Sequence, residues 1–173
     1  MDTFEAITTK LDVRLFDTKK QVPKDVKLKV LEAGRLTASG MNVQHWRFVL
    51  VQDPKSIKKL ADDSTTGQWV ATANFAIILL TDPKLPFHQL DAGRGLQDMQ
   101  LAAWNFSVAS GIYTGFDSGR MRRDFGIPST LEPSVVIGFG FPAKKIKGRK
   151  NRKSLEEVAY LEKYGNKFET AKI

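Results

Sequence analysis

The chain has no cysteine and only two histidines, His45 and His88, among its 173 residues. The absence of cysteine excludes a disulfide framework, a thiolate metal site, an iron–sulfur cluster and a cysteine nucleophile. Neither histidine has a histidine partner at a metal-ligand spacing, so we expect no metal site. A nucleophile elbow and a P-loop are missing, and Gly138 and Gly140 lack the third glycine of a dinucleotide-binding fingerprint. If the protein is an enzyme, we therefore expect a bound cofactor to supply its chemistry.

Long apolar runs are also missing. The longest, residues 75–80, is six residues long, whereas a helix that spans a bilayer needs about 20. The first residues include an early acid, Asp2, and no apolar stretch, which is unlike a signal peptide. We therefore expect a cytoplasmic protein without a membrane partner.

Positive charge is abundant but concentrated in one segment. The formal net charge is +8, and residues 144–153 contain seven Lys and Arg and no acid, which leaves 8 − 7 = +1 for the rest. Such a cluster is typical of a nucleic-acid surface or a phosphate site, and can also be solvated surface. It lacks the interleaved aromatic residues that stack on bases. A basic nucleic-acid-binding module that uses Lys144 to Lys153 stays an alternative, although we favour no nucleic-acid partner.

Hydrophobic periodicity and turn residues predict one α+β domain over residues 1–173, with a small sheet. Helices are predicted at residues 2–11, 23–38, 54–61 and 91–110 and after Ser154, and strands at residues 46–51, 75–80 and 134–141. The helix at residues 91–110 is apolar on most sides, which predicts burial. Because a chain of this size cannot surround it, we expect this helix in a subunit interface.

Two polar segments have types of residue that suit an anionic ligand. Lys10 and Arg14 flank Asp12, and residues 38–48 form a loop of small and amide residues between a predicted helix and a predicted strand. Taken alone, the second segment favours an ordinary helix C-terminal turn, in which Asn42 bonds its own backbone.

Five motifs, in order, resemble those of the flavin-dependent nitroreductase family. They are Lys-Leu-Asp-Val-Arg-Leu-Phe at residues 10–16 with Val22-Pro23 after it, Ala-Ser-Gly-Met-Asn-Val-Gln-His-Trp-Arg-Phe at residues 38–48, Gln-Asp-Met-Gln-Leu-Ala-Ala at residues 97–103, Gly-Ile-Tyr-Thr-Gly-Phe at residues 111–116, and Gly-Phe-Pro at residues 140–142 with Lys-Asn-Arg at 150–152 before Leu-Glu-Glu-Val. The fourth motif stands where the family has a flavin-contacting loop.

The resemblance implies an α+β, nitroreductase-like fold: a small, mainly antiparallel central sheet flanked by helices, in an intertwined homodimer with its active sites at the subunit interface. It implies FMN as cofactor, NADH or NADPH as electron donor, and ping-pong reduction of a small-molecule acceptor such as a nitroaromatic or quinone-like compound. Other reactions on a flavin fold, such as dehalogenation, flavin storage or flavin cleavage, stay open as alternatives.

The resemblance also assigns residues to the flavin and no side chain to catalysis. The assigned residues are Lys10, Leu11, Asp12, Arg14, Ser39, Gly40, Met41, Asn42, Gln68, Thr114, Gly115, Lys150 and Arg152. The phosphate and the ribityl chain would be held by Lys10, Asp12 and Arg14 together with Lys150 and Arg152. Arginine suits a phosphate because its guanidinium group offers a fork of donors. Residues 39–42 would meet the flavin from the other subunit. Gln68 would bond the isoalloxazine ring, and Thr114 and Gly115 would lie near its N5 atom.

This sequence departs from the family pattern at several of these positions. Asp12 replaces a small hydroxyl residue, and because a carboxylate repels a phosphate we expect it to pair with Arg14 or to offer only its backbone N–H. Ala38 replaces a proline and Leu11 a basic or polar residue, which predicts a weaker hold on the phosphate. Thr114 stands where some members have an acid. The chain is short for the family, so we expect an open pocket.

Overall fold

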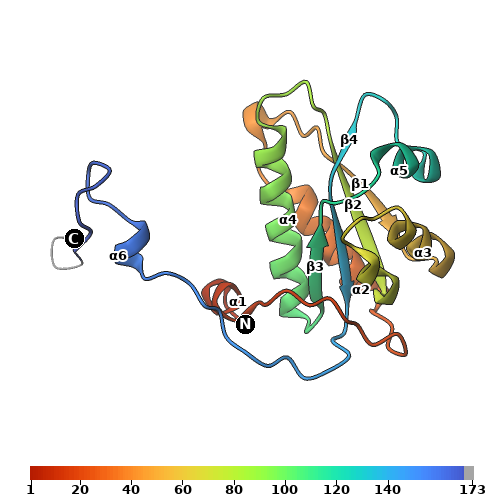
Figure 1. Cartoon of the computed structure of the whole chain (residues 1–173), viewed down its shortest axis with the longest axis horizontal. Coiled ribbons are helices and arrows are strands. Elements are labelled where there is room, and N and C mark those ends of the chain that lie inside the picture. Colours follow the sequence, from red (N-terminus) through yellow and green to blue (C-terminus); the bar gives the residue numbers. More distant parts are fainter. Residues whose placement is uncertain (170–173) are drawn as a thin grey trace.

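The computed structural model describes residues 1–169, which form four strands and six α-helices (Figure 1). The helices are α1 (Thr3–Thr9), α2 (Lys24–Leu36), α3 (Pro54–Asp62), α4 (His88–Asn105), α5 (Ser118–Phe125) and α6 (Leu155–Val158), and the strands are β1 (Arg47–Val51), β2 (Phe75–Thr81), β3 (Ala109–Tyr113) and β4 (Glu132–Gly140). Short 3₁₀ turns span Gly40–Asn42 and Gln68–Thr72. Residues 170–173 are not described.

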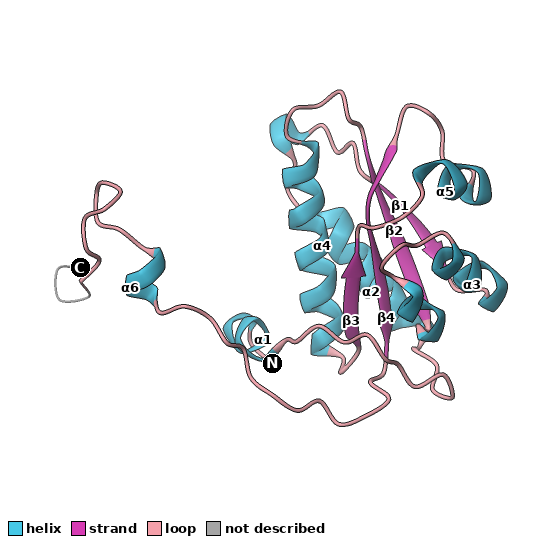
Figure 2. Ribbon diagram, viewed as in Figure 1, coloured by secondary structure: helices cyan, strands magenta, loops and turns pink. Residues whose placement is uncertain are grey.

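The four strands form one antiparallel sheet in the order β1-β2-β4-β3. All seven residues of β2 are buried, as expected for a central strand that is covered on both faces. Helices α2 and α4 cover one face, and α3 and α5 lie on the other (Figure 2). The expected α+β fold with a small antiparallel sheet and flanking helices is therefore confirmed.

Alternation along β2 divides the core into two layers. Ile77 and Leu79 pack with Met99 of α4, whereas Ile78 packs with Leu60 of α3 on the opposite face. Side chains alternate between the faces of a strand, so a continuous apolar run supplies both layers. The run that the sequence shows at residues 75–80 thus becomes the centre of the protein.

Local signals explain several helix ends. Asp53 caps α3 through its side chain, which accepts from the Ser56 N–H at 2.9 Å, and Pro54 occupies the first turn. Ser154 and Glu157 form the capping box that begins α6. These are the positions at which the sequence predicted helix starts.

One predicted element is corrected: the helix expected at residues 91–110 is α4, which ends at Asn105, and β3 follows where a loop was expected at residues 111–116. Gly111 of β3 pairs with Gly138 of β4. A Cβ at Gly111 would lie 2.9 Å from the Trp69 ring and one at Gly138 would lie 2.8 Å from it. Small residues are poor strand signals, and here they make room for an indole that is distant in sequence.

Helix α5 is also missing from the sequence prediction. Its eight residues include four charged ones, and Met121 is its buried contact with the core. Phe125, four residues later, is partly buried against the same core. Two apolar positions in eight residues are too few for the repeated stripe from which helices are recognised.

After β4, residues 141–169 form an arm that leaves the sheet, passes α1 and ends well away from the rest of the chain (Figure 1). Leu155 and Val158 of α6 are 55% and 56% exposed. In the described chain no helix is long and apolar enough to cross a membrane.

Candidate functional site

The first motif lies along the free edge of the sheet, beside β3. The Val13 N–H donates to the Ser110 carbonyl at 2.9 Å, and the Asp17 N–H donates to the Phe141 carbonyl at 2.8 Å. These backbone bonds align residues 12–17 with β3 and with the end of β4. They place Arg14 at a cavity of about 210 Å³, whose lining residues are Arg14, Thr66, Ile112, Tyr113 and Thr114.

Residues 64–68 form the other wall of this corner. The Thr65 N–H donates to the Gly115 carbonyl at 2.8 Å, and Ser64 forms a bridge with Phe116. Gln68 begins the next 3₁₀ turn, and its Nε2 donates to the Ser64 carbonyl at 3.1 Å. The structure thus brings the segments that contain Arg14, Gln68 and Thr114 to one corner.

Asp12 pairs with Lys10, so the expectation that it pairs with Arg14 or offers only its backbone is wrong. Lys10 is only 8% exposed, and its Nζ lies 2.5 Å from Asp12 Oδ1. Gln100 Nε2 of α4 lies 3.5 Å from the same oxygen and donates to Ser110 Oγ at 3.0 Å. Lys10 lies nearer to this carboxylate than Arg14 because its backbone follows α1, which packs on α4.

The basic segment contributes different residues to this corner than the resemblance assigned. A second hollow of about 340 Å³ is lined by Asp12, Val13, Arg14, Leu15, Lys144, Ile146 and Lys147. Lys144 and Lys147 therefore flank Arg14. The structure places the assigned pair elsewhere on the arm: Lys150 Nζ donates to the Ile7 carbonyl of α1, and Arg152 Nη1 donates to the Asn151 carbonyl at 2.7 Å.

Residues 39–42 lie at the opposite end of α4. The Gly40 N–H donates to Asp91 Oδ2 at 3.0 Å in the first turn of that helix. Asp12 approaches Gln100, which is 100 − 91 = 9 residues further along and thus about 14 Å along the helix axis. Within one chain, residues 39–42 and the corner at Arg14 are therefore separate.

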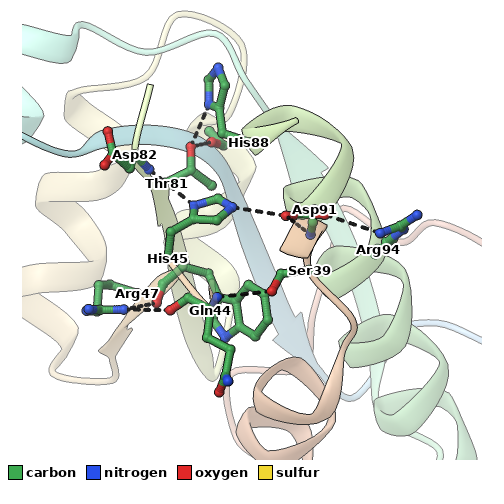
Figure 3. Close-up of polar contacts among 12 residues, drawn as sticks. Ser39, Gln44, His45, Arg47, Thr81, Asp82, His88, Asp91 and Arg94 are labelled. Carbon is green, nitrogen blue, oxygen red and sulfur yellow. Dashed lines mark hydrogen bonds and ion pairs between the residues drawn. The ribbon is translucent and has the colours of Figure 1, made fainter. Parts of the chain in front are cut away.

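The loop of residues 39–44 has an unusual backbone. Met41, Asn42 and Gln44 have φ values of 50°, 56° and 50°, which only a small fraction of non-glycine residues adopt. Met41 is 82% exposed. A side-chain network anchors the loop to the sheet and to α4 (Figure 3). Motif reasoning missed its members His45 and Asp91, which lie 91 − 45 = 46 residues apart and have no shared local pattern.

Two buried ionisable groups lie behind the corner. Burial raises the pKa of Tyr113, and its hydroxyl donates to the Leu60 carbonyl at 3.1 Å. Burial also raises the pKa of Asp63, as does Asp124, whereas Arg120 at 3.1 Å opposes this shift. Tyr113 therefore supports the wall of the cavity as a neutral phenol. Among residues 1–169 no group of three or more His, Asp and Glu is arranged to hold a metal ion.

Comparisons with known proteins identify the family of this chain. The model of the nitroreductase family matches residues 7–84. A protein from Methanothermobacter thermautotrophicus, named as a candidate NADH dehydrogenase/NAD(P)H nitroreductase, is 31% identical over 152 residues, which cover 83% of this chain and 79% of that protein.

Solved structures share the fold. A candidate NADH dehydrogenase/NAD(P)H nitroreductase from Bacteroides thetaiotaomicron is 25% identical with a TM-score of 0.84, over 91% of this chain and 96% of that one. An FMN-dependent nitroreductase from Clostridium difficile has a TM-score of 0.82 at 19% identity, over 90% of this chain and 96% of that one, and shows the fold alone. On the sequence relationship and the shared fold, this chain belongs to the nitroreductase family.

Proposed function

We propose that this protein is an FMN-dependent NAD(P)H oxidoreductase that reduces nitroaromatic or quinone-like acceptors by a ping-pong reaction. The observation that supports this most is the corner at which three separate segments meet: Arg14 and Thr114 line its cavity, and Gln68 lies in the adjoining segment of residues 64–68. Family membership and the names of its relatives point to the same activity.

The charges at the corner fit a flavin phosphate. Arg14 with Lys144 and Lys147 forms a group of three cations around one hollow, and a phosphate dianion is best held by several charge-assisted donors. Lys10 has less to offer because Asp12 already neutralises it. Lys150 and Arg152 would join the phosphate only if the arm moved from its position in this structure.

Polar groups on the other wall fit a flavin ring. Thr114 lines the cavity, Gly115 follows it in the chain, and Gln68 is an exposed residue at the start of the adjoining 3₁₀ turn. Bound FMN would supply the electron transfer from NADH or NADPH to the acceptor. Tyr113, with its raised pKa and its hydroxyl bonded to Leu60, orders the wall and is not a proton donor near neutral pH.

The proposed enzyme is a homodimer with active sites at the subunit interface. Residues 39–42 lie at the far end of α4 from the corner, which supports the proposal that they meet the flavin of a second subunit. A hollow of about 530 Å³ between α2 and α4 is lined by Thr37, Ala38, Leu90, Gly93, Arg94, Gln97 and Asp98. This hollow and the exposed apolar residues of the arm support contact with a second copy.

Titration of the purified, flavin-free protein with FMN tests the cofactor. We expect quenching of flavin fluorescence with one FMN per subunit, and a dimer in sedimentation analysis. No FMN binding would overturn the proposal. Turnover with NADH and with NADPH, against a panel of nitro compounds, quinones and halogenated aromatics, then separates reduction from the alternative flavin reactions.

A further inference from the structure

A buried histidine and a buried aspartate lie beneath the loop of residues 39–44 (Figure 3). The side chain of His45 is 6% exposed and that of Asp91 is 0% exposed, and His45 Nε2 lies 3.1 Å from Asp91 Oδ2. The other ring nitrogen, Nδ1, lies 3.3 Å from the backbone nitrogen of Asp82. Both ring nitrogens of His45 therefore have partners.

These partners define the proton position on the ring. A backbone N–H can only donate, so the Asp82 N–H requires His45 Nδ1 to accept. The proton of the neutral ring is then on Nε2, which donates to the Asp91 carboxylate. His45 thus acts on Asp91 as a hydrogen-bond donor, and Asp82 holds the ring in that orientation.

The Asp91 carboxylate accepts hydrogen bonds from three residues. Its Oδ2 accepts from His45 and from the Gly40 N–H at 3.0 Å, and its Oδ1 accepts from Arg94 at 3.3 Å. Gly40 also packs against Phe87, whose ring a Cβ at Gly40 would approach to 2.6 Å. The carboxylate therefore ties the start of the loop to the first turn of α4.

Few other bonds hold this loop. The Gln44 N–H donates to Ser39 Oγ at 3.0 Å, and the Asn42 N–H donates to the Ser39 carbonyl at 3.0 Å, but both bonds lie within the loop itself. Three residues in the left-handed region persist only where their surroundings enforce that backbone. From outside the loop, Asp91 holds its start at the Gly40 N–H, and Arg47 of β1 holds its end by donating to the Gln44 carbonyl at 3.1 Å.

We propose that Asp91 and His45 are positioning residues, which hold residues 39–44 in the backbone conformation that the flavin site of the partner subunit requires. This inference rests on the proposed function, because it assumes that residues 39–42 meet the flavin across the interface. Neither side chain touches the flavin. Asp91 acts through the Gly40 N–H, and His45 acts through Asp91.

The first test needs no flavin. In Asp91→Ala both carboxylate oxygens are removed, so the Gly40 N–H, His45 and Arg94 lose their shared acceptor. We expect the Gly40 amide to exchange with solvent about tenfold faster or more in this variant, the usual effect of losing a hydrogen bond to a charged group. Amide exchange measured by NMR would show it.

The second test separates the two bonds of His45. A glutamine places its amide nitrogen near the position of Nε2 and keeps the donation to Asp91, whereas an asparagine places its carbonyl oxygen near Nδ1 and keeps only the bond to Asp82. We expect His45→Gln to retain FMN affinity within about threefold and His45→Asn to lose about tenfold. FMN titration of both variants, beside Asp91→Ala, measures this rescue.

Ser134→Ala is the matched control. It removes a bond of 2.7 Å to Thr81 Oγ1 in the polar group that neighbours His45, but has no link to the loop. We expect a lower melting temperature with unchanged FMN affinity and unchanged Gly40 exchange. A stability defect alone therefore would not imitate the proposed effect.

The outcomes separate this inference from the proposed function. If wild-type protein binds no FMN, the proposed function fails, and Gly40 exchange still shows whether Asp91 anchors the loop. If wild-type protein binds FMN and Asp91→Ala binds it equally well with unchanged Gly40 exchange, the inference is overturned. Should Asp91→Ala fail to fold, equal FMN affinity of His45→Gln and His45→Asn would overturn it instead.

Discussion

The two ends of α4 hold two parts of the proposed flavin site in different ways. Near its last turns, residues 12–17 are attached to the sheet by backbone bonds, such as Val13 to Ser110. At its first turn, residues 39–44 are attached by side chains: Asp91 accepts from the Gly40 N–H, and Arg47 donates to the Gln44 carbonyl. Backbone bonds follow from the topology and survive most side-chain changes, whereas a side-chain anchor is lost with one substitution. We therefore expect the first region to be robust and the second to be adjustable.

The largest loss of stability should come from a substitution in the core of α4, because both regions are attached near this helix. Met99 is fully buried and packs between the helix and the sheet. Met99→Asp would place an unpaired charge in this core, which is strongly unfavourable. We expect loss of cooperative folding, measured by near-ultraviolet circular dichroism and urea denaturation. A folded Met99→Asp protein would contradict the packing described for α4.

The next largest effect should come from Gly111→Ala, which should disrupt the attachment of residues 12–17 to β3 and leave residues 39–44 unchanged. A Cβ at Gly111 would lie 2.4 Å from the Val13 carbonyl oxygen, a backbone atom that cannot rotate away. Gly111→Ala should therefore separate residues 12–17 from β3, at a cost of about 1–3 kcal/mol in the free energy of unfolding, and weaken FMN binding. The Gly40 amide is the internal control, since its exchange should stay at the wild-type rate.

A third experiment identifies the cations that hold the phosphate. Arg14→Ala should weaken FMN binding by about 1.5–3 kcal/mol, the usual size of a hydrogen bond to a charged group, without lowering stability. Arg152→Ala is the informative companion. An equal loss would show that the arm brings Arg152 to the phosphate in the dimer, and unchanged affinity would leave that role to Arg14, Lys144 and Lys147. Fluorescence titration with FMN measures both.

The smallest effect should be on the pH dependence of stability and concerns Asp63, which follows the last residue of α3. Its pKa is raised in the folded protein, first by burial and then by Asp124, so folding favours its protonated form. Its contribution to stability is therefore greatest at low pH and falls as pH rises from its ordinary value through the raised one. Asp63→Asn should remove this fall. Urea denaturation between pH 3 and pH 7 tests it, and equal pH profiles of wild type and variant would refute it.

Sequence reasoning worked best where the signal was local. The apolar run at residues 75–80 predicted β2, which ends one residue later at Thr81, and Ser154 marked the start of α6. It failed at β3, where Gly111 leaves room for Trp69 and the strand is held by its pairing with β4 rather than by strand propensity.

The candidate site shows the same division. The family resemblance indicated the segments that contain Arg14, Gln68 and Thr114, and the structure brings these segments to one corner. The partner of Asp12 was mispredicted, because the distance to Lys10 depends on how α1 packs on α4. Dimerisation and the roles of Lys150 and Arg152 stay predictions.

By itself the sequence determined the two buried layers on either face of β2, the concentration of charge in residues 144–153 and the family, because periodicity, composition and motif order are properties of the linear chain. Only the tertiary structure decided which cations surround Arg14, that Asp12 neutralises Lys10, and that Asp91 anchors Gly40. The geometry of these contacts is set by how segments pack across the sheet and along α4. No short stretch of sequence contains a pattern that predicts such packing.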